Sequence, residues 1–252
     1  MTNVVITMAG AGQRFRNAGY TCPKYCISVH GKTLFSWAMM SLASFIKEGA
    51  VFTFICRSED TAAGFIEAEC RGLGIHRYAV LQLDTQTDGQ ATTALMAESV
   101  LENQALPFLI YNIDTFVHPD AIDAARVRGD GWIPCFPGKG DGWSFAKADP
   151  SGKVLELREK LRISPHATIG LYWFSSFHLY KSAYHDYYSD SSRMEKGEKY
   201  VAPLYNQLIG NSLDVFIHEV PYDMVIPLGT PQEVNDFQQR GEGAARLETL
   251  AS

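Results

Sequence analysis

Short β-rich runs alternate with helical stretches in the first half of the chain, and this alternation restricts the fold more than any other feature. We expect strands at residues 4–7, 51–56, 78–83 and 108–112, and helices at residues 34–47, 61–70 and 90–101. Strands separated in this way are typical of βαβ units on a parallel sheet, because a parallel connection needs a crossover. The pattern predicts an α/β fold, a Rossmann-like three-layer sandwich with a predominantly parallel central sheet.

The rhythm changes near Trp132, where strand-like segments follow one another with little helix between them. Residues 143–147 and 153–158 predict a hairpin, because the intervening Asp149-Pro150-Ser151-Gly152 favours a turn. Further on we expect extended segments at residues 168–174 and 213–226, helices at residues 202–209 and near Thr230-Pro231, and a frayed tail after Gly241. These segments indicate a small β-rich insertion near residues 132–175.

Charge and cysteine content exclude several kinds of partner. The formal net charge is -6, which disfavours a general attraction to nucleic acid or to anionic lipid. No apolar run approaches the roughly 20 residues that cross a bilayer. The five cysteines have no paired C-x-x-C spacing, which argues against a disulfide framework and a structural zinc site. We expect a cytoplasmic protein with reduced thiols that binds neither nucleic acid nor membrane.

A glycine-containing loop, Gly10-Ala11-Gly12, follows the first predicted strand. Glycine lacks the Cβ that would keep a phosphate away from the backbone. Arg14 comes directly after this loop, and Lys24 stands behind Pro23. Side chains of this kind are usually solvated surface. Two cations near backbone amides would nevertheless neutralise a triphosphate and the charge that builds on it when the α-phosphorus is attacked.

Two other phosphate-binding loops fit the residues less well. A dinucleotide-binding loop needs a third glycine near Arg14 and an acidic residue at the end of the second strand, but Glu59 and Asp60 come too late. A Walker loop needs a Gly-Lys-Ser/Thr that this loop lacks. A nicotinamide-dependent oxidoreductase is therefore the weakest of the enzyme classes considered.

Several motifs, in one order and spacing, resemble the sugar-phosphate nucleotidyltransferase family. They are Met8-Ala9-Gly10-Ala11-Gly12-Gln13-Arg14-Phe15, Gly19-Tyr20, Pro23-Lys24, Gly31-Lys32, Asp88-Gly89-Gln90-Ala91, Asn112-Ile113-Asp114-Thr115, Glu159-Lys160 at a strand end, Ala167-Thr168-Ile169-Gly170-Leu171-Tyr172 and Gly229-Thr230-Pro231. The resemblance covers nearly the whole chain; Tyr25 departs from it, because many members have a second proline there. It implies an enzyme of class EC 2.7.7 that uses Mg²⁺ to join an NTP to a phosphorylated small molecule, first of all a sugar 1-phosphate, releasing pyrophosphate.

The resemblance also implies roles for individual residues. Nucleotide would be bound by Ala9, Gly10, Ala11, Gly12, Gln86, Asp88 and Gly89, acceptor by Glu159, Lys160 and Gly170, and metal by Asp114, with Arg14 and Lys24 as catalytic residues. Asp114 has independent support, because ligands of open α/β sheets bind at the carboxyl ends of strands and Mg²⁺ prefers carboxylate and phosphate oxygens. Residues 1–131 would be mainly the nucleotide-binding half, and residues 132–240 mainly the acceptor-binding half, of one domain covering residues 1–252.

Some features leave alternatives open. Many family members have an aspartate two residues before Gly-Thr-Pro, where this chain has Pro227. Three alternatives follow: Asp223 takes the place of that aspartate, one carboxylate is enough to bind the metal, or the chain is an inactive nucleotide-binding regulatory subunit. The acceptor is alternatively a non-sugar phosphate such as phosphocholine, with CTP as donor, and the base is not assigned. The aromatic residues between Tyr172 and Tyr188 favour a core or an interface, which makes a homo-oligomer possible.

Overall fold

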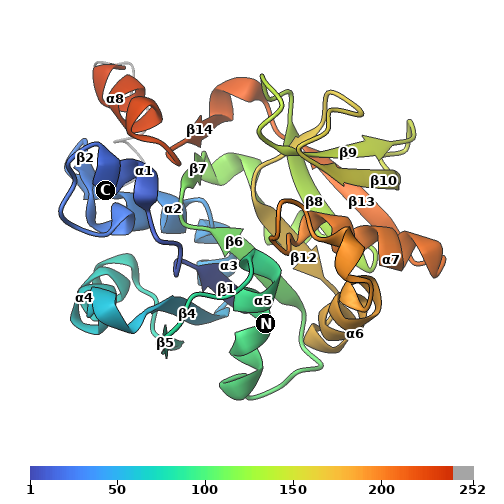
Figure 1. Ribbon diagram of the computed structural model, residues 1–252, viewed down its shortest axis with the longest axis horizontal. Helices are drawn as coiled ribbons and strands as arrows, with labels where there is room; N and C mark the ends of the chain where they lie inside the picture. The colour runs from blue at the N-terminus through green and yellow to red at the C-terminus, as the bar shows by residue number, and fades with distance from the viewer. Residues whose placement is uncertain (241–252) are drawn as a thin grey trace.

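The computed structural model describes residues 1–240, and one large sheet runs through the molecule (Figure 1). Its strands are β1 (Asn3–Thr7), β4 (Val51–Arg57), β5 (Tyr78–Leu83), β6 (Phe108–Asn112), β8 (Gly131–Phe136), β9 (Ser144–Ala148), β10 (Val154–Glu159), β11 (Ala167–Thr168), β12 (Leu171–Phe174) and β13 (Val215–Glu219). The order in this 10-stranded sheet is β10-β9-β11-β8-β12-β6-β1-β4-β5, and β13 pairs with β8. Two small antiparallel pairs stand apart, β2 (Ser28–Val29) with β3 (Lys32–Thr33) and β7 (Thr115–Val117) with β14 (Val225–Pro227).

Most strands of the large sheet point the same way. β5, β4, β1 and β6 are parallel neighbours, and β13 is parallel to β8. β12 is antiparallel to both β6 and β8, so β8 has the same direction as β6. β11 is antiparallel to both β8 and β9, so β9 also has that direction. Only β10, β11 and β12 are reversed. The predicted α/β fold with a mostly parallel sheet is confirmed, and the antiparallel pairs gather in the part that follows β6.

Helices cover both faces of this sheet. They are α1 (Gln13–Asn17), α2 (Leu34–Met40), α3 (Ala43–Lys47), α4 (Ala63–Leu73), α5 (Gln90–Leu95), α6 (Phe177–Tyr188), α7 (Tyr205–Gly210) and α8 (Pro231–Gln239). Short 3-10 helices are η1 (Lys24–Cys26), η2 (Ser58–Asp60), η3 (Met96–Ser99), η4 (Pro119–Ala121), η5 (Ala124–Arg126), η6 (Ser191–Arg193), η7 (Ala202–Leu204) and η8 (Tyr222–Met224). Among residues 1–240, no helix is long and apolar enough to cross a membrane.

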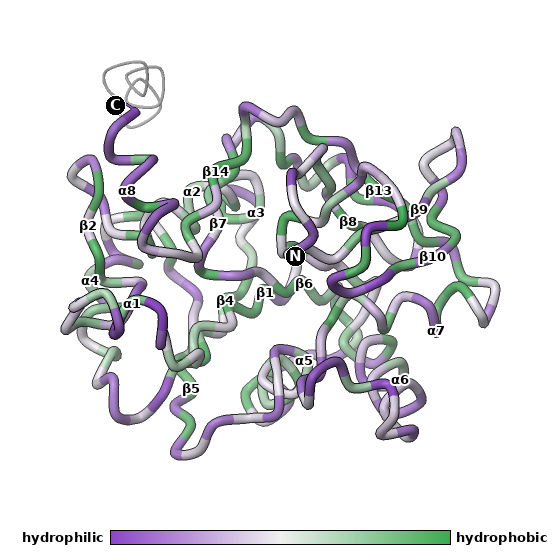
Figure 2. The backbone as a smooth tube through the Cα atoms, turned by 45° about the horizontal axis from the view of Figure 1, so that its top comes forward, coloured by the Kyte–Doolittle hydropathy of each residue, from purple (hydrophilic) through white to green (hydrophobic). Residues whose placement is uncertain are grey.

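Successive residues of β1 face opposite layers, because side chains alternate along a strand. Val4 and Ile6 join a core cluster with residues of α2, α3 and α4, whereas Val5 joins a cluster with residues of α5, α6 and α7. A third cluster packs α1 and α8 against α2 and β7. Figure 2 shows hydrophobic colour along β1 and β4 and hydrophilic colour along much of α1 and α8, as burial of the sheet requires. The predicted three-layer arrangement follows from these two clusters.

Helix α6 was not expected, and it is the largest difference from the sequence prediction. Its aromatic residues have modest helix propensity. One face of the helix is nevertheless buried and consists of Phe177, Tyr180, Ala183 and Tyr184. The Ser176 hydroxyl caps the start of the helix by accepting from the Leu179 amide at 3.1 Å. Tertiary packing of this face therefore decides the structure. Most of the aromatic cluster is core, as the sequence favoured, whereas Tyr172 also lines cavity B and Tyr187 and Tyr188 are only partly buried.

Three predicted elements are shorter than expected. The helix at residues 34–47 breaks after Met40, where the buried Ser41 hydroxyl accepts from the Val117 amide at 2.9 Å. The helix at residues 90–101 tightens into η3 after Leu95, and the strand at residues 168–174 is interrupted at Gly170, whose φ is 81°. The frayed tail expected after Gly241 lies outside the described residues.

Candidate active site

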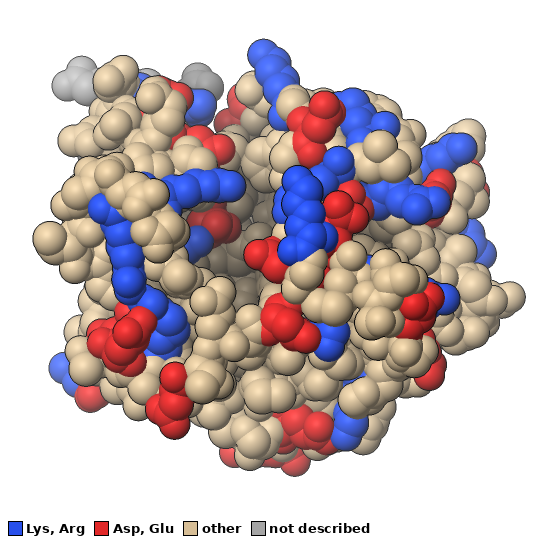
Figure 3. Space-filling view, in the orientation of Figure 1, with Lys and Arg blue, Asp and Glu red and all other residues tan. Residues whose placement is uncertain are grey.

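Two cavities meet at the carboxyl ends of β1 and β6, where the molecular face is hollowed and ringed by charged side chains (Figure 3). Cavity A, of about 550 Å³, is lined by Thr7, Ala9, Gly10, Lys24, Gln86, Thr87, Asp88, Gly89, Gln90, Thr93, Asn112, Ile113, Asp114, Gly197 and Glu198. Cavity B, of about 590 Å³, is lined by Gln90, Asn112 and Asp114 again, and by Arg14, Thr115, Lys139, Gly142, Trp143, Ser144, Glu159, Lys160, Thr168, Ile169, Gly170, Tyr172, Tyr200, Pro227, Gly229, Thr230 and Glu233. The two cavities thus share three side chains.

Every residue to which the resemblance gave a role lines one of three neighbouring cavities. Ala9, Gly10, Gln86, Asp88, Gly89 and Lys24 line cavity A, Arg14, Glu159, Lys160 and Gly170 line cavity B, and Asp114 lines both. Ala11 and Gly12 line a third cavity of about 440 Å³, which shares Gly10 and Lys24 with cavity A. Arg14 is exposed and borders cavity B, not cavity A. The predicted nucleotide and acceptor residues therefore separate onto two sides of one hollow.

An ion pair joins Lys24 and Asp114 where the cavities meet. Lys24 Nζ lies 2.7 Å from Asp114 Oδ2, and the two side chains are 19% and 28% exposed. Lys24 opens η1 directly after Pro23, whereas Asp114 occupies the turn between β6 and β7. The Leu228 amide donates to the Asp114 carbonyl at 2.8 Å, and the Tyr111 hydroxyl donates to the Thr115 carbonyl at 2.7 Å. The carboxylate is therefore held by a turn that is fixed on both sides.

Amide side chains form the shared floor of the two cavities. The Gln90 amide donates to the Thr7 hydroxyl at 3.1 Å and also to the Asn112 side-chain oxygen. Gly170 approaches from β12, and its carbonyl accepts from the Asn112 backbone amide at 3.1 Å. A Cβ at Gly170 would overlap the Asn112 side chain. Only glycine allows this approach, which explains the glycine predicted at the acceptor side.

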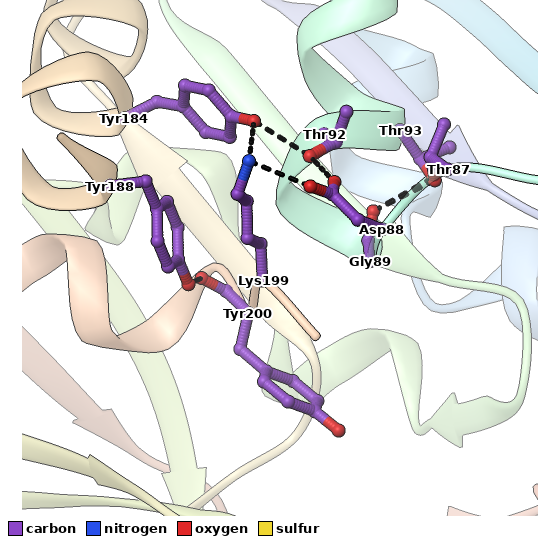
Figure 4. Close-up of polar contacts among 9 residues, drawn as sticks. All are labelled: Thr87, Asp88, Gly89, Thr92, Thr93, Tyr184, Tyr188, Lys199 and Tyr200. Carbon is purple, nitrogen blue, oxygen red and sulfur yellow. Dashed lines mark hydrogen bonds and ion pairs between the residues drawn. The ribbon is translucent and has the colours of Figure 1, made fainter. Parts of the chain in front are cut away.

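The loop at residues 86–90 is fixed from behind by Lys199 (Figure 4). Lys199 Nζ lies 2.8 Å from Asp88 Oδ2 and 3.2 Å from the Tyr184 hydroxyl. Burial alone would raise the pKa of Asp88, but the hydrogen bonds from Lys199 and Thr92 outweigh it and lower that pKa. The carboxylate of Asp88 is thus engaged within the protein, so the side chain holds the loop in place.

Glu159 and Lys160 lie together at the end of β10. Glu159 is 8% exposed, accepts a hydrogen bond from the Ser144 hydroxyl, and has one carboxylate oxygen 3.9 Å from Lys160 Nζ. Burial raises the pKa of Glu159, partly opposed by Ser144 and Lys160. Lys160 also donates to the Tyr200 hydroxyl. An ammonium group therefore faces cavity B beside a buried carboxyl.

A second carboxylate, that of Glu233, borders cavity B near Asp114. An atom placed as a Cβ on Gly229 would be 3.3 Å from Asp114 Oδ2 and 3.6 Å from Glu233 Oε2. Glu233 accepts from the Thr230 hydroxyl at 3.0 Å, and its backbone amide donates to the same hydroxyl at 3.2 Å at the start of α8. Asp223, the residue considered from the sequence, is exposed on η8 and borders neither cavity. Glu233 is the acidic side chain that α8 places on the Asp114 side.

Several cavity residues were not singled out as site residues from the sequence. Gln90 and Asn112 stand inside quoted motifs, so their spacing offered a signal. Thr230 also stands inside a quoted motif, and Glu233 lies three residues later, a capping-box spacing that points to a helix start and not to a site. Glu198, Tyr200 and Trp143 gave no local signal, because their neighbours in the cavities come from distant parts of the chain.

Comparison with known proteins agrees with this geometry. No family model and no curated protein matches the chain. A nucleoside-diphosphate-sugar pyrophosphorylase from Vibrio cholerae is 37% identical, with 94% of this chain and 100% of that chain covered and a TM-score of 0.87. The inositol-1-phosphate CTP transferase from T. maritima is 15% identical, covers 96% and 97% of the two chains, and has a TM-score of 0.73. A UDP-glucose pyrophosphorylase complexed with UDP-glucose is 13% identical, covers 98% and 99%, and also has a TM-score of 0.73.

The last two similarities concern the fold, since their identities are low. The first extends over the whole of its relative at an identity that indicates common descent. The motifs that resembled nucleotidyltransferases also meet around one hollow. The chain therefore belongs to the sugar-phosphate nucleotidyltransferase family and is a nucleotidyltransferase.

Proposed function

We propose that the protein joins an NTP to a sugar 1-phosphate, giving a nucleotide-activated sugar and pyrophosphate, and that it does so in the cytoplasm. The observation that carries this proposal is the meeting of two cavities at the Lys24–Asp114 pair, with Lys160 across cavity B. A transfer between two phosphate-bearing ligands needs two adjoining pockets and cations between them. The similarity to the Vibrio cholerae pyrophosphorylase covers 94% of this chain and 100% of that chain, which supports a single nucleotidyltransferase domain.

In this mechanism cavity A holds the nucleotide. Gln86, Asp88 and Gly89 border the base and ribose, while the backbone from Ala9 to Gly12 faces the triphosphate. An oxygen of the acceptor phosphate attacks the α-phosphorus, and the bond from that phosphorus to the bridging oxygen of the β-phosphate breaks, so that pyrophosphate leaves. Because the attacking oxygen is already anionic, no general base is required.

Three cations serve the transferring phosphate and the acceptor. Lys24 stabilises the charge that develops around the α-phosphorus, because it lies where cavities A and B meet. Lys160 binds the acceptor phosphate, and Glu159 accepts hydrogen bonds from acceptor hydroxyls beside Gly170. Arg14, exposed at the edge of cavity B, contributes charge to the bound triphosphate from the acceptor side.

The residues present fit a magnesium ion. Among residues 1–240 no cluster of three or more acidic, histidine or cysteine side chains is arranged to hold a metal alone. Mg²⁺ commonly takes one or two carboxylates and completes its shell with phosphate oxygens and water, which Asp114 and Glu233 would allow. When bound, the ion would neutralise phosphate charge. Glu233 then takes the place of the aspartate that Pro227 replaces.

Pyrophosphate release tests the proposed function. The protein is incubated with Mg²⁺ and each of ATP, CTP, GTP, UTP and dTTP, against a panel of sugar 1-phosphates and phosphocholine. We expect release with one or a few NTP and sugar 1-phosphate pairs. Release with CTP and phosphocholine alone would replace the sugar acceptor by an amino-alcohol phosphate. Nucleotide binding without release from any pair would reject catalysis and favour a regulatory subunit.

A further inference from the structure

A short hairpin at residues 195–200 stands between the two cavities. Glu195 and Glu198 exchange backbone hydrogen bonds of 3.0 Å, and Lys196 and Gly197 between them have φ values of 52° and 79°. Positive φ at both central residues is the geometry of a tight hairpin turn. We call this segment the bridge, because its two ends border different cavities. Gly197 and Glu198 line cavity A, and Tyr200 lines cavity B.

The bridge is anchored on the loop that borders the nucleotide. The Lys199 amide donates to the Asp88 carbonyl at 2.7 Å, and the Ala91 amide donates to the Lys199 carbonyl at 3.0 Å. A Cβ on Gly89 would overlap the Lys199 backbone, so this contact requires glycine. The ion pair between Lys199 and Asp88 adds a side-chain bond (Figure 4). A displacement of the loop at residues 86–90 would therefore displace the bridge.

A chain of hydrogen bonds leads from the bridge to the acceptor side. Lys160 Nζ donates to the Tyr200 hydroxyl, which in turn donates to the Glu198 carboxylate. Lys160 Nζ also lies 4.4 Å from the centre of the Tyr200 ring. Burial and the Glu198 carboxylate raise the pKa of Tyr200, so the hydroxyl keeps its proton at neutral pH. The position of the Lys160 ammonium thus depends on the position of Glu198.

Resting on the proposed function, we propose that the bridge couples the two cavities, with Glu198 responding to the nucleotide and Tyr200 acting as the positioning residue for Lys160. Glu198 keeps lone pairs free beyond the one that Tyr200 uses. The donors that a nucleotide presents to a carboxylate are ribose hydroxyls and base N–H groups. A nucleotide bonded to Glu198 fixes the bridge, and the Tyr200 hydroxyl then holds Lys160 toward the acceptor phosphate.

A purely structural bridge predicts something different. If the bridge only completes the fold, loss of the Tyr200 hydroxyl would lower stability or weaken phosphate binding equally with and without nucleotide. Coupling instead means that nucleotide tightens phosphate binding, and by linkage phosphate tightens nucleotide binding by the same factor. The dependence of one affinity on the other ligand is therefore the quantity to measure.

The test is titration calorimetry of inorganic phosphate, with and without a saturating nucleoside monophosphate, in EDTA. The monophosphate is the tightest binder among AMP, CMP, GMP, UMP and dTMP. We expect the nucleotide to tighten phosphate binding about five-fold in the wild type and less than two-fold in Tyr200→Phe and Glu198→Gln. Tyr78→Phe, on edge strand β5 and outside both cavities, is the matched control and keeps the five-fold ratio. The phosphate binding that remains in Lys160→Met measures binding at other sites of the protein.

An unchanged ratio in Tyr200→Phe, or no effect of nucleotide in the wild type, would overturn the coupling. Failure of the bridge and failure of the proposed function can be told apart. Turnover with no coupling rejects the bridge alone. Coupling with no pyrophosphate release from any substrate pair rejects the proposed transfer and retains the bridge.

Discussion

Cavities A and B are built in different ways, although they share a floor. Cavity A lies over loops that follow parallel strands, because residues that come after β1, β5 and β6 line it. Cavity B is lined by residues from the β9–β10 hairpin, β12, the bridge and α8, which are far apart in the chain. Recognition in cavity A therefore depends on the strand ends of one parallel sheet, whereas recognition in cavity B depends on the tertiary packing of distant segments.

The largest expected effect concerns Asp114, one of the three residues common to both cavities. Asp114→Asn should lower kcat about 10³-fold, because a metal ligand contributes several kcal/mol to the transition state. Steady-state pyrophosphate release measures it, with Asp236→Asn on the exposed side of α8 as control. If activity stayed within ten-fold of the wild type, Asp114 would only line the two cavities and would not belong to the reaction centre.

Lys24→Met should lower kcat about 10²-fold, as expected for removing one group that stabilises developing charge. The KM of the acceptor should change little, because Lys24 borders cavity A and not cavity B. Lys47→Met, in α3 and outside both cavities, serves as control. An effect on the acceptor KM alone would show that Lys24 serves acceptor binding and does not stabilise the developing charge.

Lys160→Met should raise the acceptor KM about 10- to 100-fold, because a charge-assisted hydrogen bond to phosphate is lost. The NTP KM should rise by no more than the coupling factor of about five. Initial rates with each substrate varied in turn separate the two constants. Equal increases in both would show that the two cavities do not bind separate ligands.

Glu233→Gln should weaken divalent metal binding about 10-fold in the presence of nucleotide. Titration of Mn²⁺ followed by electron paramagnetic resonance gives the affinity without turnover. Asp223→Asn, on exposed η8, should leave it unchanged. The reverse result would restore Asp223 as the second carboxylate and leave Glu233 as a helix cap.

The smallest effect concerns pH. Since burial raises the folded-state pKa of Glu159 above its ordinary value of 4.5, its favourable contribution is complete below the unfolded pKa and is lost as pH rises through the folded pKa. The melting temperature of Glu159→Gln minus that of the wild type should therefore increase by about 2 °C between pH 4.5 and pH 7.5. A difference that stayed constant across this range would mean that Glu159 is not buried as a carboxyl.

The sequence predicted the residues of cavity A better than those of cavity B, because many residues of cavity A lie at the ends of parallel strands. Strands at residues 78–83 and 108–112 were predicted with the observed bounds, and the second is a continuous apolar run because it is buried on both faces. The glycine loop and Asp114 follow parallel strands closely in the chain, whereas Lys24 was found through the Pro23-Lys24 motif. Local patterns are enough to find residues that a strand end positions.

Motifs predicted Glu159, Lys160 and Gly170, but the rest of cavity B depends on contacts that no local pattern contains. Helix α6 was missed because its aromatic residues favour a helix only once they pack on the sheet. Tyr200 meets Lys160 across 40 residues of chain, and Glu233 comes near Asp114 only because α8 folds back over β7. Such neighbours follow from the tertiary structure, so sequence motifs named the strand ends and not the side chains that complete the site.

The shared floor has a consequence for the end of the reaction. A product that keeps the nucleotide in cavity A and the sugar in cavity B remains attached at both ends after pyrophosphate departs. Each half then holds the other at high effective concentration. Escape of the finished molecule would therefore be slow, and a stable analogue spanning Gln90, Asn112 and Asp114 would bind more tightly than either substrate.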